Sequence, residues 1–230
     1  QYTLDMFKAK NKHDLLTRLH EVFRDDMKDH FREQLIDLWD GKLFMQREVL
    51  NYGLDGNPLN IHLQFSVFNG REQNWDLVLL ALTDITARKK AEAYLEYLGK
   101  HDVLTKLKNR SFYVDEISRL ERKGPFPVTV IIIDINNLKT VNDTQGHAAG
   151  DDLLRRTGEI LNQLSGRGVT AMRIGGDEFA VFMPGANDEA RTNLLTNLKK
   201  ITDLNNQFYS GSSLQLAVGW AISREGERLE

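Results

Sequence analysis

The sequence that decides the fold of the C-terminal half is Gly175-Gly176-Asp177-Glu178-Phe179. Strand-like apolar runs flank it at residues 170–174 and 179–183, so the two glycines are expected to turn a hairpin. A hairpin turn that needs positive φ would favour Gly-Gly whatever the function. The turn geometry does not explain the two carboxylates that follow immediately, because neighbouring carboxylates repel each other unless a positive charge lies near them. The pentapeptide therefore predicts a hairpin whose turn carries functional acids.

A second acidic position lies about 40 residues upstream. The apolar run at residues 128–133 predicts a buried strand, and Asp134 stands at its end. An acid in such a place is often only a solvated cap or the N-cap of a following helix. In an open α/β sheet, the end of a strand is also where ligands bind. Two acids that converge on one pocket can hold a hard divalent cation beside phosphates, so we expect Asp134 and Asp177 to lie close together.

The rest of the C-terminal half alternates between helical and strand-like patterns. Helices are expected at residues 111–122, 147–164 and 188–204, and strands at 128–135 and 214–221, besides the two strands of the hairpin. This order predicts an α/β domain in which helices cover a central sheet.

The N-terminal half has helices first and strands afterwards. Apolar spacing predicts helices within residues 11–40, and strand-like runs follow at 43–52, 59–68 and 75–85. We therefore expect an α+β unit there. Residues 87–101 form a charged amphipathic helix with a heptad-like apolar seam. The seam is only about two heptads long, which favours a helix on its own domain over a stable coiled coil, although it is well placed to join two chains in a dimer.

Composition narrows the classes of function. The chain has 230 residues, a formal net charge of −3 and no cysteine. The charge disfavours a broad nucleic-acid surface, and the missing cysteines exclude a disulfide or a thiolate metal site. No apolar stretch approaches the length of a membrane span, and we expect a cytoplasmic protein. Because the chain begins with Gln1, we also expect it to be a piece of a longer protein, truncated at both ends.

Four spaced motifs in residues 102–221 resemble one family. They are Asp102-Val-Leu-Thr-Lys-Leu-Lys-Asn109-Arg110, Asp134-Ile-Asn-Asn-Leu-Lys-Thr-Val-Asn-Asp143, Gly146-His-Ala-Ala-Gly-Asp151 and Arg173-Ile-Gly-Gly-Asp-Glu-Phe179. Together they resemble the GGDEF domain of diguanylate cyclases, which has a nucleotidyl-cyclase-like fold. Residues 1–86, which end in Thr83-Asp84-Ile85-Thr86, resemble the C-terminal part of a PAS sensory domain. The resemblance thus implies a partial PAS domain at 1–86, a connecting helix at 87–101 and a GGDEF domain at 102–230.

The family resemblance implies roles for particular residues. Asp134, Asp177 and the backbone carbonyl of Ile135 would hold Mg²⁺ or Mn²⁺, and Glu178 would lie beside the reacting groups as a ligand or a base. The backbone of Asn137 and Leu138, together with Lys139, would bind the β- and γ-phosphates, as the N–H groups at a helix start attract phosphate. Asn142 and Asp151 would read guanine, since a carboxylate can accept from both N1–H and the N2 amine. His147 is interpreted as structural.

The chain also departs from the family pattern. Asn136 and Leu138 replace the usual Asp and Phe, for which we expect modest effects. Gly166 and Val169 occupy the two positions of the inhibitory product site, and Arg167 is out of register, so no product inhibition is expected there. The chain ends before the family's last helix, whose Lys and Arg contact the triphosphate, which leaves the activity of this piece open.

The leading hypothesis is a signal-regulated diguanylate cyclase, an enzyme that condenses two GTP molecules into cyclic di-GMP and acts as a homodimer. The alternative is a catalytically inactive GTP-binding module that regulates an attached or partner EAL phosphodiesterase. A third hypothesis is a sensor and dimerisation fragment without a nucleotide role. The signal sensed by the PAS-like part is not identified by the sequence, and the intact pentapeptide favours the first hypothesis.

Overall fold

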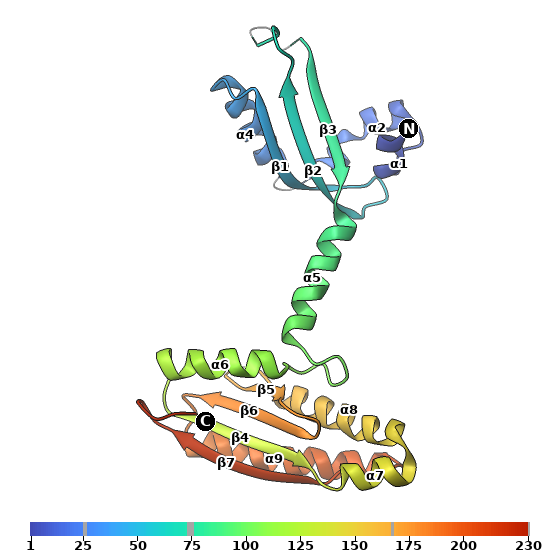
Figure 1. Ribbon diagram of the computed structural model, residues 1–230. Helices are drawn as coiled ribbons and strands as arrows, with labels where there is room; N and C mark the ends of the chain where they lie inside the picture. The colour runs from blue at the N-terminus through green and yellow to red at the C-terminus, as the bar shows by residue number, and fades with distance from the viewer. Residues whose placement is uncertain (25–26, 73–75, 167, 230) are drawn as a thin grey trace. The chain divides into compact units, whose positions relative to one another are not determined.

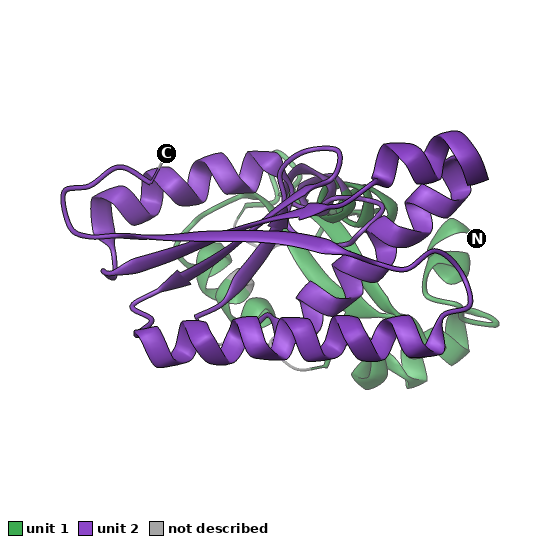
Figure 2. Ribbon diagram, turned by 90° about the horizontal axis from the view of Figure 1, so that it is seen from below, with its two compact units in different colours: residues 1–94 green, residues 95–230 purple. Residues whose placement is uncertain are grey.

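The structure is a computed structural model that describes residues 1–24, 27–72, 76–166 and 168–229. It divides into two compact units, residues 1–94 and 95–230 (Figure 2). Trp75, the first residue of the strand predicted at 75–85, and Arg167, near the predicted product site, lie outside the described residues. Within the described ranges, every helix is too short or too polar to cross a membrane.

In unit 1, a helical segment precedes a three-stranded sheet. Its elements are α1 (Tyr2–Met6), α2 (Lys12–Thr17), α3 (Leu19–Val22), α4 (Met27–Trp39), β1 (Phe44–Tyr52), β2 (Pro58–Val67) and β3 (Val78–Asp84). The strands form an antiparallel meander in the order β1-β2-β3 (Figure 1). One side of it packs on the first helices around a buried core made of Met6, Phe7, Val22, Val49, Ile61 and Leu63. The α+β arrangement expected for this half is therefore present.

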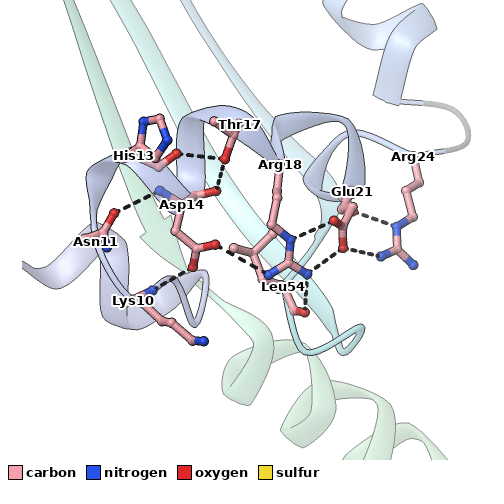
Figure 3. A network of polar contacts seen from close by, with 9 residues as sticks. All are labelled: Lys10, Asn11, His13, Asp14, Thr17, Arg18, Glu21, Arg24 and Leu54. Carbon is pink, nitrogen blue, oxygen red and sulfur yellow. Dashed lines mark hydrogen bonds and ion pairs between the residues drawn. The ribbon is translucent and has the colours of Figure 1, made fainter.

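A polar network connects the N-terminal helices with one another and with Leu54 (Figure 3). The side chain of Asn11 accepts the backbone N–H of Asp14 at 2.9 Å and caps α2. Arg18, between α2 and α3, donates to both carboxylate oxygens of Glu21, at 2.7 and 2.8 Å, and to the carbonyl of Leu54 at 3.3 Å. The guanidinium thus connects the break between α2 and α3 to the turn between β1 and β2.

Helix α5 (Thr86–Lys100) begins where β3 ends and covers nearly the same residues as the predicted connecting helix. The Asp84 carboxylate accepts the Thr86 N–H at 2.8 Å, and the Thr86 hydroxyl accepts the N–H of Asn60 on β2 at 2.9 Å. One turn later, Arg88 and Lys89 both pair with Glu48 on β1. The start of α5 is therefore fixed to the sheet of unit 1 by side chains of the Asp84–Thr86 turn.

Unit 2 is built on a four-stranded sheet. Its elements are α6 (Arg110–Lys123), β4 (Val128–Ile135), α7 (Leu138–Gln145), α8 (His147–Leu164), β5 (Thr170–Arg173), β6 (Glu178–Pro184), α9 (Asp188–Phe208) and β7 (Leu216–Ser223). The strand order is β5-β6-β4-β7, and every neighbouring pair is antiparallel.

The sheet of unit 2 has a helical layer on each face. Helix α6 covers one face, and α8 and α9 cover the other (Figures 1 and 2). The strands supply alternate side chains to the two sides: Ile131 and Ile133 pack with the α8–α9 layer, and Val128 and Val130 pack with α6. This period of two places the apolar run at the centre of the domain.

The predicted elements of unit 2 are all present, with ends shifted by a few residues. What differs is the direction of the strands. The rule that ligands bind at the carboxyl ends of strands belongs to parallel sheets, so it does not apply to this antiparallel sheet. Instead, the end of β4 meets the beginning of β6, because the two strands run in opposite directions.

Candidate functional site

The register of two central strands brings the predicted acids together. Asp134, near the end of β4, lies opposite Glu178, the first residue of β6. The Ile135 N–H donates to the Asp177 carbonyl at 3.2 Å. Phe179 follows and is fully buried, so its side chain anchors the hairpin in the core. The structure therefore places Asp134, Ile135, Asp177 and Glu178 at one end of the sheet.

The electrostatics of this acidic end favour a cation. Burial raises the pKa of Asp134 above its ordinary value, and the charges of Asp177 and Glu178 raise it further. Among the described residues, no lysine or arginine pairs with any of these three carboxylates. No group of three or more His, Asp or Glu side chains there has the arrangement of a complete metal site either. This donor set suits Mg²⁺ or Mn²⁺, since Mg²⁺ is usually held by one or two carboxylates and completes its shell with water and phosphate oxygens.

The presence of glycine at positions 175 and 176 has a different explanation from the one that the sequence predicted. Neither Gly175 nor Gly176 adopts positive φ, so the hairpin-turn explanation for the pair is wrong. A Cβ on Gly175 would instead lie 2.6 Å from the carboxylate Oε2 of Glu178. The first glycine thus makes room for an acidic side chain, while a Cβ on Gly176 would meet no atom within 4 Å.

An arginine holds the hairpin in place. Arg173 Nη2 donates to the Gly176 carbonyl at 2.7 Å, and its Nη1 donates to both carboxylate oxygens of Asp102, at 3.2 and 3.3 Å. Asp102 also accepts the backbone N–H and the hydroxyl of Thr105, at 2.8 and 2.7 Å. Burial alone would raise the pKa of Asp102, but these hydrogen bonds and the charge of Arg173 outweigh it and lower the pKa. Neither Arg173 nor Asp102 was predicted to have a function, and their only signal in the sequence is their place in two of the four motifs.

The residues predicted to bind the phosphates lie shortly after the end of β4, at the start of α7. Asn137 adopts the left-handed conformation with φ +62°, and its side chain makes no capping hydrogen bond to α7. The first N–H groups of α7 have no acceptor within the helix. A cavity of about 370 Å³ lies beside this helix start. It is lined by Leu138, Lys139, Asn142, Asp143, His147, Leu154, Arg173, Gly176 and Asp177.

The two predicted guanine readers lie on neighbouring helices. A Cβ on Gly150 would lie 2.0 Å from Asn142 Oδ1, so this glycine lets Asn142 of α7 pack against α8. Asp151 is the next residue, half exposed, and its carboxylate is 3.7 Å from Arg155. Asp151 is not among the residues that line the cavity, and neither are Asp134, Ile135, Asn137 and Glu178. A larger cavity of about 610 Å³ lies between α9 and β7 but contains none of the predicted site residues, so the chemistry favours the smaller one.

Comparisons with known proteins agree with these motifs. Residues 99–230 match the family "Diguanylate cyclase, GGDEF domain". A "Probable diguanylate cyclase DgcE" of Escherichia coli is 27% identical over 187 residues, which are 80% of this chain and 17% of that protein. An "Uncharacterized signaling protein" of Caulobacter vibrioides is 35% identical over 136 residues, 57% of this chain and 17% of that protein. The chain thus spans about a sixth of the length of these two relatives.

Solved structures support the fold of unit 2. The coiled coil and GGDEF domain of DgcB from Caulobacter crescentus, solved in complex with c-di-GMP, superposes with a TM-score of 0.54 at 22% identity. The superposition covers 63% of this chain and 80% of the other. At this identity the likeness speaks for the fold alone. The family match over residues 99–230, more than half of the chain, shows that the chain belongs to the GGDEF diguanylate cyclase family.

Proposed function

We propose that the chain is a diguanylate cyclase, whose unit 2 binds one GTP and faces a second copy to condense two. The observation that carries the proposal is the β4–β6 register, which gathers Asp134, Asp177 and Glu178 at one end of the sheet. Beside them, Asp177 shares a cavity with Lys139 and the start of α7. Acids for a cation and N–H donors for phosphates are the two parts that phosphoryl transfer needs.

Each of the predicted site residues has a specific role in the proposed reaction. Asp134, Asp177 and the Ile135 carbonyl would hold Mg²⁺ or Mn²⁺, which when bound neutralises charge on the triphosphate. The Asn137 and Leu138 backbone and the Lys139 ammonium would bind the β- and γ-phosphates. Glu178 lies next to the reacting groups, as a cation ligand or as an acceptor of the 3′-hydroxyl proton. Asn142 and Asp151 would pair with guanine and leave an unpaired carboxylate when adenine binds.

The proposed reaction consists of two phosphoryl transfers. The 3′-oxygen of one GTP bonds to the α-phosphorus of the other, the bond from that phosphorus to the pyrophosphate oxygen breaks, and the hydroxyl proton leaves to an acceptor. A second transfer in the reverse direction closes the ring, so that two GTP give cyclic di-GMP and two pyrophosphates. Catalysis here would consist mainly of positioning and charge stabilisation.

Residues 1–86 are proposed to be a PAS-type sensor, and α5 the helix that transmits its state. The three-stranded meander and the capped Asp84–Thr86 turn support this proposal. So do the ion pairs of Glu48 with Arg88 and Lys89, because a shift of β1 would move the start of α5. The apolar seam of α5 consists of Ala87, Ala91, Tyr94 and Leu98. Its first three residues are exposed, Tyr94 to 60%, as residues at a dimer seam would be in a single chain, and Leu98 is partly buried.

Incubation of the purified chain with GTP and MgCl₂, followed by chromatography of the nucleotides, tests the proposal. We expect cyclic di-GMP and pyrophosphate to form, and neither to form when EDTA is present. GTP that binds but stays intact would replace the cyclase with the alternative, a regulatory GTP-binding module for an EAL phosphodiesterase. A chain that binds no GTP would contradict both functions.

A further inference from the structure

A buried arginine lies on α8, away from the acidic end of the sheet. Arg156 is only 1% exposed. Its Nε donates to Asn205 Oδ1 at 2.8 Å, its Nη1 to the Ser212 carbonyl at 2.8 Å, and its Nη2 to Asn206 Oδ1 at 3.0 Å. The guanidinium carbon is also 4.4 Å from the centre of the Tyr209 ring. A single side chain thus binds the end of α9 and the segment that follows it.

The partners of Arg156 are neutral, which is unusual for a charge that is so fully buried. The nearest carboxylate, Asp152, is 3.9 Å away and half exposed, so the ion pair is weak. The guanidinium is satisfied by the planar arrangement of its N–H groups, each aimed at a different acceptor. A lysine has a single nitrogen at its tip and could not reach all three acceptors at once.

The segment that Arg156 holds is hydrogen-bonded to a residue just before α7, the helix of the proposed nucleotide site. Asn206 exchanges two hydrogen bonds of 2.8 Å with the backbone of Leu214. The next carbonyl, that of Gln215, accepts the N–H of Asn136 at 2.9 Å, just before the start of α7.

The same segment also contacts the other end of α7. The Ser212 hydroxyl donates to the side-chain oxygen of Gln145, the last residue of that helix, at 2.8 Å. Residues 212–215 therefore bracket α7 from both ends. Between those ends lie Leu138, Lys139 and Asn142, which all line the 370 Å³ cavity.

We propose that Arg156 is a positioning residue for GTP binding, which sets the place of α7 through residues 205–215. The proposal rests on the proposed function of unit 2, because α7 carries the groups assigned to the phosphates and the base. A residue that acts on α7 in this way affects binding of the substrate in its ground state, so it changes KM more than kcat. A residue that only stabilises the fold would lower the melting temperature and leave KM unchanged.

The test compares Arg156→Lys with Arg119→Lys, a matched change on α6 whose guanidinium is half exposed and paired with Glu116. Hydrogen exchange followed by mass spectrometry reports on the protein without any need for activity. In Arg156→Lys we expect peptides that span residues 136–145 to exchange about tenfold faster, and peptides of α6 to be unchanged. We expect KM for GTP to rise about tenfold and kcat to change less than threefold. Arg119→Lys should match the wild type in all of these measurements.

Two results would overturn the proposal. One is unchanged exchange at residues 136–145 in a folded Arg156→Lys protein, and the other is an equal acceleration in every helix of unit 2. If Arg156→Lys does not fold, Ser212→Ala replaces it, because it removes only the contact with Gln145. Its expected effect is a two- to threefold faster exchange near residue 145, and no change there would also count against the proposal. If the wild type binds no GTP, the proposed function fails, and the exchange data still decide whether Arg156 positions α7.

Discussion

Two carboxylates of unit 1, Asp37 and Glu48, and the carboxylates at the acidic end of unit 2 are in opposite electrostatic environments. In unit 1, Lys42 donates to Asp37 at 2.6 Å, Arg47 pairs with the same group, and together they lower its pKa although partial burial opposes them. Lys89 and Arg88 lower the pKa of Glu48 in the same way. In unit 2, by contrast, burial and two neighbouring acids raise the pKa of Asp134.

This difference separates acids that form ion pairs within the chain from the acids proposed to bind a cation. Side chains of the same chain supply the cations that pair with Asp37 and Glu48, and these ion pairs join α4 to β1 and β1 to the start of α5. At the end of β4, no lysine or arginine among the described residues forms an ion pair with Asp134, Asp177 or Glu178, and the nearby guanidinium of Arg173 is hydrogen-bonded to Asp102 and Gly176. We infer that the missing positive charge at this end comes from outside the chain.

The largest expected effect comes from removal of one of the unpaired acids. Asp177→Ala should lower the rate of GTP condensation by about 10³-fold or more, because stabilisation by a bound cation contributes several kcal/mol to phosphoryl transfer. The fold should stay intact, as judged by circular dichroism. Undiminished turnover in this variant would remove Asp177 from the proposed cation site.

A smaller effect is expected from the proposed guanine reader. Asp151→Ala should reduce the preference for GTP over ATP by about 10- to 100-fold, since a hydrogen bond to a charged group contributes about 1.5–3 kcal/mol. Binding of both nucleotides is measured by calorimetry. Arg155→Ala is the matched control, because it removes only the partner of Asp151, and it should keep most of the discrimination. An Asp151→Ala protein with wild-type discrimination would contradict the assignment.

Neutralisation of single acids should have opposite effects in the two units. Asp37→Asn should lower the melting temperature of unit 1 by about 1–3 °C, because Lys42 and Arg47 lose their partner. Asp177→Asn should raise that of metal-free unit 2 by a similar amount, because the repulsion around Asp134 decreases. Calorimetry without divalent cations measures both changes. Shifts of the same sign in the two variants would remove the distinction between the two groups of acids.

The pH dependence of the free energy of unfolding gives a further test, at Asp102. Its pKa is lower in the folded state than in the unfolded state, so its contribution to stability is present above the ordinary pKa and is lost as pH falls through the folded value. Asp102→Asn should therefore cost about 1 kcal/mol near neutral pH and almost nothing near pH 2. Thermal unfolding between pH 2 and pH 7 checks this, and a penalty that is constant across the range would rule out the ionic contribution.

Local patterns in the sequence predicted much of the fold. The apolar run at residues 128–133 identified the central strand, and the periodic apolar positions of residues 147–164 predicted α8 with the same ends. Asp134, Asp177 and Glu178 were predicted from the motifs as site residues. The strand register places Asp134 opposite Glu178, and Asp177 is the residue before Glu178.

Other features depend on contacts that are distant in the sequence. The antiparallel order of the sheet and the pairing of Arg173 with Asp102, 71 residues away, leave no periodic signal. Arg156 resembles any charged residue on an amphipathic helix, and only the structure shows that it is buried under residues 205–212. The role of Gly175 was also hidden, because it depends on where the side chain of Glu178 lies.

The most direct test of the central claim is a titration with Mn²⁺ followed by electron paramagnetic resonance, which distinguishes free from bound ion. Wild type and Asp37→Asn should bind Mn²⁺ with equal affinity, and Asp134→Asn should bind it at least about tenfold more weakly, because Mn²⁺ prefers carboxylate oxygens that have no cationic partner. Equal binding by wild type and Asp134→Asn would contradict the claim that the acids of β4 and β6 form a cation site.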